Sequence, residues 1–149
     1  MTFRMSIKTK GSLTGGELEV ALNTWAAEIG PVLATEIRRR APVSPSQSGG
    51  RLRSSIRYEQ RGSGQGLQLR YLSDAPYARV VTNGSRAHRI EPRNARALHW
   101  MDGGRDVFAR AVNHPGTRPN PFPRKAIEAR KSWLMERLIA NVSKEVEKK

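Results

Sequence analysis

The chain has 149 residues, no cysteine, and 27 Lys and Arg against 13 Asp and Glu, for a formal net charge of +14. The lack of cysteine excludes disulfides and thiolate metal sites, and no apolar run approaches the ~20 residues that span a bilayer. The length fits one domain, residues 1–149, and a domain this basic attracts polyanions or acidic protein surfaces.

The first third of the chain predicts a long helix. Residues 1–15 are expected to form a flexible lead-in. From Gly16 to Arg40 the apolar residues follow steps of three and four, which is typical of an amphipathic helix with one buried stripe: Leu18, Leu22, Trp25, Ile29, Val32 or Leu33, and Ile37. Gly30-Pro31 predicts a kink or a break, and Ala41-Pro42 ends the helix.

A hairpin and a short helix are predicted next. The Ser-, Pro- and Gly-rich residues 43–50 form a loop. Residues 51–60 alternate as in a half-buried strand, the glycine-rich residues 61–66 form a turn, and residues 67–73 alternate again, so we expect a β-hairpin. In residues 74–84 we expect a short helix, capped by Asp74 and closed by Asn83-Gly84, with a strand as the alternative.

The arginine-rich part predicts short strands and a loop. The segments 87–92 and 97–101 are strand candidates, the second returning after an arginine-bearing loop, and residues 105–114 are a third. Residues 115–123 are rich in proline and must form a loop. An amphipathic helix begins at Pro121 and frays over residues 143–149. We therefore predict an α+β fold, with long N-terminal and C-terminal helices packed on a small, mainly antiparallel β-sheet with extended loops.

No motif typical of catalysis, cofactor binding or metal binding occurs in the sequence. His88, His99 and His114 lack the spacing of a metalloprotease helix, and there is no phosphate-binding loop. We therefore predict no catalytic, cofactor-binding or metal-ligating residue and no enzyme activity. A weaker alternative is a nuclease that uses His88, His99 or Glu91.

The arginines are the leading candidates for contact with a partner, because a guanidinium forms paired hydrogen bonds and is weakly hydrated. Aromatic residues are too few, and reading helices too unclear, for direct recognition of a base sequence. Sequence-independent binding of nucleic acid through phosphates remains the main alternative function, and a solvated basic hairpin is the simplest alternative for residues 88–100. The interface candidates are Arg51, Arg53, Arg86, Arg89, Arg93, Arg96, Trp100 and Arg118.

Three blocks of sequence, in order, resemble one family. They are RRRAPVSPSQSGGRLRSSI, PYARVVTNGSRAHRIEPRNARALHW and VNHPGTRPNPFPRKAIE, and together they extend from about Ile37 to Glu128. They resemble the gene-product-ten-like tail-component family of long-tailed bacteriophages, the tail-completion or neck proteins.

The resemblance implies a structural virion protein that joins head and tail, assembled in the host cytoplasm. It implies a homo-oligomeric, hexameric ring and no catalysis, cofactor or membrane. The partners that it implies are head-completion or connector proteins, tail terminator or tail-tube proteins, and DNA in the channel, contacted non-specifically.

Overall fold

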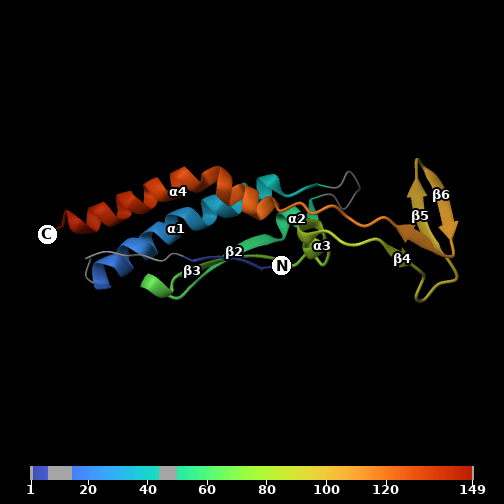
Figure 1. Cartoon of the computed structure of the whole chain (residues 1–149), viewed down its shortest axis with the longest axis horizontal. Coiled ribbons are helices and arrows are strands. Elements are labelled where there is room, and N and C mark those ends of the chain that lie inside the picture. Colours follow the sequence, from blue (N-terminus) through green and yellow to red (C-terminus); the bar gives the residue numbers. More distant parts are fainter. Residues whose placement is uncertain (1, 7–14, 44–49, 149) are drawn as a thin grey trace. The chain divides into compact units, whose positions relative to one another are not determined.

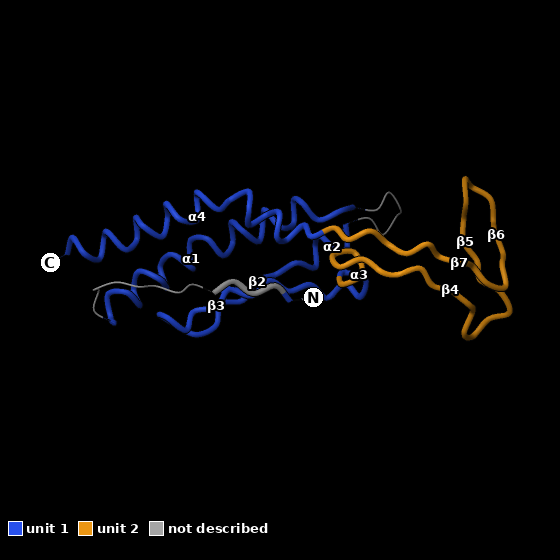
Figure 2. The backbone as a smooth tube through the Cα atoms, viewed as in Figure 1, with its two compact units in different colours: residues 1–78, 121–149 blue, residues 79–120 orange. Residues whose placement is uncertain are grey.

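The computed structural model describes residues 2–6, 15–43 and 50–148. Unit 1 comprises residues 1–78 and 121–149, and unit 2 comprises residues 79–120 (Figure 2). Unit 2 is thus an insertion between two segments of unit 1. The sequence predicts one domain, and the contacts within the chain form two compact units. In the described ranges, no helix is long and apolar enough to cross a membrane.

Helix α1 (Gly15–Arg40) is the centre of unit 1. It packs against helix α4 (Phe122–Val146) and against a sheet (Figure 1). The predicted stripe is confirmed from Leu22 onward, since Leu22, Trp25, Ile29, Leu33 and Ile37 are all buried, whereas Leu18 at its start is only half-buried. α4 packs mainly on α1 and not directly on the sheet, so α1 is buried on two sides. This explains why α1 contributes more buried hydrophobic residues than any other described element.

The Gly30-Pro31 pair does not break α1, contrary to one of the two predicted outcomes. The hydroxyl of Thr35 donates to the carbonyl oxygen of Pro31 at 3.0 Å, one turn later. Gly30 has a packing role, because a β-carbon there would lie 2.5 Å from Cε2 of Tyr58. The glycine therefore lets the sheet approach the helix closely.

The sheet of unit 1 has three antiparallel strands in the order β1-β3-β2. β2 (Ile56–Arg61) and β3 (Gln68–Ser73) form the predicted hairpin, closed through the short 3-10 helix η1 (Gly64–Gly66). β1 (Thr2–Ser6) pairs with β3, so residues 2–6 form a strand where a flexible lead-in was expected. Antiparallel pairing along β3 gives this segment its structure. The rest of the lead-in, residues 7–14, lies outside the described residues, as do residues 44–49 of the predicted loop.

The predicted strand at residues 51–60 is wrong in its first half. Arg51–Ser54 form one helical turn, α2, and the strand begins at Ile56. The amide of Ser54 donates to the carbonyl oxygen of Gly50 at 2.9 Å, and the φ of Gly50 is +99°. Leu52 and Ile56, both buried, are four residues apart. Their spacing therefore fits a helical turn as well as a strand.

Polar contacts join α1 to α4 along their length. The indole Nε1 of Trp25 donates to the carbonyl oxygen of Leu134 at 2.8 Å. Arg137 and Asn141 donate to Oε2 of Glu28 at 2.8 and 3.1 Å. The hydrogen bond from Arg137 lowers the pKa of Glu28 despite partial burial. These contacts fix the register of the two antiparallel helices.

Unit 2 consists of short elements. α3 (Ala78–Asn83) leads into it, which confirms the predicted helix, although Asp74 pairs with Arg57 and does not cap it. The strands are β4 (His88–Ile90), β5 (Leu98–Asp102), β6 (Arg105–Ala109) and β7 (Val112–His114). β4 pairs with β7 and β5 with β6, all antiparallel.

Two predictions for this region need correction. The strand after the arginine-bearing loop does not return beside β4, because β5 pairs with the strand that follows it. The predicted strand at residues 105–114 is two strands separated by Arg110-Ala111. The α+β class with long terminal helices and small antiparallel sheets is confirmed.

Candidate functional site

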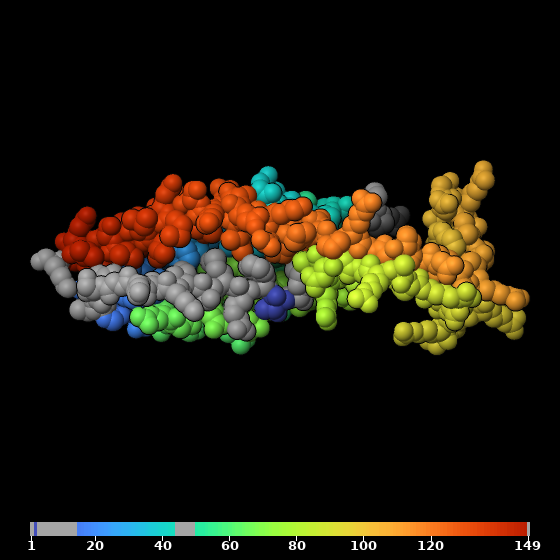
Figure 3. Space-filling view, in the orientation of Figure 1, coloured from blue at the N-terminus to red at the C-terminus, as the bar shows by residue number. Residues whose placement is uncertain are grey.

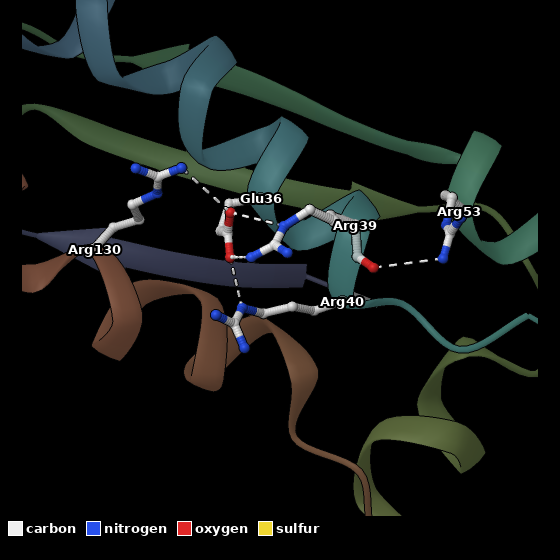
Figure 4. A network of polar contacts seen from close by, with 5 residues as sticks. All are labelled: Glu36, Arg39, Arg40, Arg53 and Arg130. Carbon is white, nitrogen blue, oxygen red and sulfur yellow. Dashed lines mark hydrogen bonds and ion pairs between the residues drawn. The ribbon is translucent and has the colours of Figure 1, made fainter.

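Unit 1 holds an arginine cluster at the C-terminal end of α1. Glu36 is only 3% exposed and lies among three guanidinium groups (Figure 4). Arg39 Nη2 and Arg40 Nε each lie 2.7 Å from Glu36 Oε1, and Arg130 Nη2, from α4, lies 3.5 Å from Oε2. One carboxylate thus gathers cations from both long helices.

The electrostatics of the cluster favour a charged Glu36. The hydrogen bond from Arg39 lowers its pKa to about 2, the bond from Arg40 adds to this, and burial opposes it. The three arginines and one carboxylate leave two positive charges unbalanced. The side chain of Arg39 is 67% exposed, so this surplus faces solvent at the end of α1.

The structure places the two interface candidates of unit 1 on α2, beside this cluster. Arg53 Nη2 donates to the carbonyl oxygens of Arg39 and Ala41 at 3.4 and 3.2 Å, so it satisfies backbone acceptors at the end of α1 (Figure 4). Arg51 is exposed. Contact of either arginine with a partner stays a prediction, and Arg53 already has a structural role.

The base of unit 2 brings together two of the sequence blocks noted above. Ser85, after Asn83-Gly84, forms a bridge with Thr117 of the His-Pro-Gly-Thr stretch. The two backbone amides donate to each other's carbonyl oxygens at 3.0 and 3.1 Å. A β-carbon on Gly84 would lie 2.6 Å from the carbonyl oxygen of Thr117, and one on Gly116 2.4 Å from that of Ser85. Both glycines are therefore required by the close approach of the two segments.

A pair of histidines lies beyond this bridge. His88 is opposite His114 in the β4–β7 ladder, and their ring centroids are 5.0 Å apart. The Nδ1 of His114 accepts a hydrogen bond from the amide of Gly116 at 3.0 Å, and that of His88 lies 3.0 Å from the carbonyl oxygen of Arg86. Both rings therefore have local structural partners, which links the ladder to the base.

The residues of the nuclease alternative lie on different elements. His88 and Glu91 line an open hollow of about 690 Å³ formed by the continuous segment 88–93. His99 lies on β5, where its Nε2 is 2.6 Å from Oδ1 of Asp106. Among the side chains that the structure describes, no group of three or more His, Asp or Glu is placed to hold a metal ion.

The arginine candidates of unit 2 lie on its surface. Arg89 pairs with Glu91 at 2.8 Å. The others are exposed, and within the described part of the chain no ion pair to them is found: Arg86, Arg93, Arg96 and Arg118. They extend over β4, the loop before β5 and the proline-rich loop. Their contact with a partner stays a prediction.

The β5–β6 hairpin contains exposed residues that the sequence interpretation missed. Trp100, a predicted interface candidate, is 39% exposed, but Met101 and Phe108 are more exposed, at 62% and 67%. The sequence feature that could have revealed this hairpin is Asp102-Gly103-Gly104-Arg105, because two glycines between alternating residues favour a two-residue hairpin turn. Both glycines have positive φ, +56° and +83°.

Unit 2 has a further property that sets it apart from unit 1. Every residue from 79 to 120 is described, and none of them is buried. Unit 2 also carries eight arginines, no lysine and three carboxylates. Isolated two-stranded ribbons are marginally stable in water. The arrangement is therefore suited to contact with another molecule.

Comparison with known proteins gives one family. Residues 6–84 match the family described as "Bacteriophage HK97-gp10, putative tail-component". This match begins and ends earlier than the predicted resemblance over residues 37–128; it includes α1, the β2–β3 hairpin and α3. No curated protein and no solved structure gives a significant match. With more than half of its length matched, the chain belongs to the HK97-gp10-like family and is a structural, virion-associated tail component of a bacteriophage.

Proposed function

We propose that the protein is a tail-completion or neck subunit, which forms a homo-oligomeric ring and joins the head connector to the tail. Its partners are head-completion or connector proteins on one side and tail terminator or tail-tube proteins on the other. The ring is assembled in the host cytoplasm. In this role the protein is not an enzyme and needs no cofactor.

The absence of any buried residue in unit 2 is the observation that carries this proposal. A folded segment of 42 residues with exposed Trp, Met and Phe side chains gains stability when these are covered, because removal of apolar surface from water is favourable. The exposed arginines add charge that acidic partner surfaces or DNA phosphates would neutralise. Such features are expected of a subunit that completes its fold by assembly.

The first experiment is to measure the mass of the purified protein by light scattering at low and high salt. A discrete oligomer, or a monomer that joins one when tail-tube or connector proteins are added, supports the proposal. A monomer that ignores these partners contradicts it.

The second candidate function, sequence-independent binding of nucleic acid, is favoured by the exposed arginines of both units. It predicts that the isolated protein binds duplex DNA and that the logarithm of the affinity falls linearly with the logarithm of the salt concentration. Substitution of Arg86, Arg93 and Arg96 by Gln would lower this slope. DNA binding without binding to tail proteins would replace the neck proposal.

The nuclease alternative is tested separately. Plasmid cleavage is measured with Mg²⁺ or Mn²⁺, with His88→Ala, His99→Ala and Glu91→Gln as the variants. We expect no cleavage above a buffer control. Cleavage that one of these substitutions abolishes would contradict a purely structural role.

A further inference from the structure

The β5–β6 hairpin presents apolar side chains on both of its faces. The register places His99 opposite Phe108 and Met101 opposite Asp106 on one face, and Trp100 opposite Val107 on the other. The ring of His99 stacks on that of Phe108, with centroids 4.7 Å apart, and is held by Asp106. Phe108 is thus positioned on the surface by a polar pair. Phe108 is 67% and Met101 62% exposed, so this face of the hairpin is accessible to a partner.

Positive charge surrounds this apolar surface. Arg105 follows the turn of the hairpin, and Arg96 and Arg110 lie just before and just after its strands. All three are exposed, and no ion pair to them is found in the part of the chain that the structure describes. A matching surface must therefore combine apolar groups with carboxylates.

Unit 1 has a surface of that kind on α4. Met135, Ile139, Val142 and Val146 follow steps of four, three and four and lie on one face of the helix. Ile139 is 61% exposed, and Met135 and Val146 are each 49% exposed. Figure 3 shows the outer side of α4, in orange to red, as a continuous surface along unit 1. None of the described residues covers this stripe.

The same end of the helix pair carries the acidic residues. The first half of α1, which lies beside the second half of α4 (Figure 1), has Glu17 and Glu19 and no Lys or Arg, and Glu28 follows directly. α4 contributes Glu136, and Glu147 follows its last residue. Glu19, Glu136 and Glu147 are exposed, and over the described ranges no ion pair to them is found. The second half of α4 also carries Arg137 and Lys144, and Arg137 pairs with Glu28, so Glu19, Glu136 and Glu147 are the carboxylates left for a partner.

We propose that the β5–β6 hairpin of one copy docks on the apolar stripe of α4 in the next copy. Met101 and Phe108, which share one face of the hairpin, would cover Met135, Ile139 and Val146, while the arginines at the hairpin meet the exposed glutamates Glu19, Glu136 and Glu147. The two surfaces differ, so the contact is heterologous, and its repetition generates a ring when the rotation between neighbouring copies closes. This inference rests on the proposed ring function and names the surfaces that build the ring.

A second copy fits the hairpin better than two other occupants. Duplex DNA offers phosphates to the arginines but no apolar surface for Met101 and Phe108. A symmetric contact between two hairpins would bring arginines against arginines, which is unfavourable at short distance. The α4 stripe supplies both apolar area and carboxylates.

The test uses two full-length variants that each lose one surface. The hairpin variant carries Met101→Ser and Phe108→Ser, and the helix variant carries Met135→Ser and Ile139→Ser. All four side chains are exposed, so the helical circular dichroism signal of each variant should equal that of the natural protein. Val43→Ser, at an exposed valine outside both surfaces, is the matched control.

Sedimentation velocity over a range of concentrations gives the outcome. We expect the natural protein and the control to form oligomers and each variant alone to remain a monomer. A mixture of the two variants should yield a particle of two chains, because it contains one intact hairpin and one intact stripe. An exchange of charges, Arg105→Glu with Glu136→Arg, should restore association that either change alone weakens.

Three results would overturn the inference. One is a natural protein that stays monomeric at every concentration. Another is that either variant keeps its helical circular dichroism signal and still forms oligomers. The third is a mixture that remains monomeric, since a contact between identical surfaces cannot be complemented. Failure of the neck proposal has a different result: the protein self-associates through these surfaces but does not bind connector or tail-tube proteins. Conversely, a protein that stays monomeric but binds those partners contradicts only the proposed contact between the β5–β6 hairpin and α4.

Discussion

Glu36 is a single buried carboxylate that organises three arginines from two helices. Its charged form is favoured by hydrogen bonds from Arg39 and Arg40, and Arg130 ties it to α4. A buried charge is tolerated only when it has such partners. The side chain therefore acts as a link between α1 and α4 near the end of α1.

The lowered pKa of Glu36 makes the stability of unit 1 dependent on pH. The folded value is about 2 and the ordinary value is 4.5, so the contribution is fully present above pH 4.5 and is lost as the pH falls towards 2. Glu36→Gln should lower the free energy of unfolding by about 1–3 kcal/mol at pH 7. It should also flatten the dependence on pH below 4.5.

Urea unfolding followed by circular dichroism at several pH values measures this effect. Glu128→Gln is the control, because Glu128 is exposed and pairs only with Arg124 on its own helix. An equal loss of stability for both variants at pH 7 would show that the cluster does not stabilise unit 1.

Gly30 gives a second prediction for a single residue. Alanine usually stabilises a helix relative to glycine by about 0.5–1 kcal/mol. Here the added methyl group would meet the ring of Tyr58 at 2.5 Å, so we expect Gly30→Ala to destabilise unit 1 by about 1–3 kcal/mol. Gly16→Ala, with open space around it, should be neutral or stabilising. Thermal unfolding of the two variants measures the effect. A lower melting temperature for Gly30→Ala alone shows that the contact with Tyr58 outweighs the higher helix propensity of alanine.

At the scale of single residues, the sequence predicted the burial of side chains that recur with the period of one helix. The buried stripe of α1 was predictable because its spacing is visible within one segment. The Glu36 cluster was not, because Arg130 comes from a distant helix. Nor was the role of Arg53 as a partner for backbone carbonyls, because α2 itself was unexpected. The contacts of the arginine candidates in unit 2 stay predictions.

The strand pairs differ in how they are supported. The β2–β3 hairpin packs on α1 and places Leu69 and Tyr71 in the core. The β5–β6 hairpin has the same local hydrogen bonding but no buried residue. Backbone hydrogen bonds alone contribute little net stability, so the second hairpin depends on what covers it.

Hydrogen exchange measured by mass spectrometry tests this difference between elements. In the monomeric protein we expect the amides of β5 and β6 to exchange much faster than those of β2 and β3. In the oligomer, or with a tail partner bound, exchange in β5 and β6 should slow while that in β2 and β3 changes little. Equal protection of both hairpins in the monomer would contradict the interpretation of unit 2.

Sequence patterns predicted the long elements better than the short ones. α1, α4 and the β2–β3 hairpin have enough residues for a period to be recognised, and Gly-rich turns bound them. The failures are α2, the split of residues 105–114 and the partner of β5. In these segments only three to six residues carry the pattern, and tertiary pairing decides between helix and strand.

On the scale of the whole molecule, unit 2 is joined to unit 1 through two adjacent segments. The Ser85–Thr117 bridge has the paired hydrogen bonds that flank a two-residue hairpin turn. Residues 86–116 can therefore be replaced by Asn-Gly without strain at the bridge.

We expect this replacement to leave the cooperative unfolding of unit 1 intact and to abolish self-association. Differential scanning calorimetry should show a melting temperature within a few degrees of the natural protein, and light scattering should show a monomer. Exchange of Gly103-Gly104 for Asn-Gly, which keeps the hairpin turn, is the control. A shortened protein that still forms the oligomer would exclude unit 2 from the interface.

The insertion of unit 2 also has a consequence for the order in which the chain folds during synthesis. Trp25 and Leu134, which are hydrogen-bonded, are separated by 109 residues, so α1 cannot be covered by α4 until nearly the whole chain has left the ribosome. The strands of unit 2 pair with one another and can close earlier, since local contacts form fastest. The nascent protein therefore presents its α1 stripe to chaperones and proteases throughout the synthesis of unit 2. If translation stops before Pro121, the chain contains all the strands of unit 2 but lacks α4, so the buried stripe of α1 stays exposed to water.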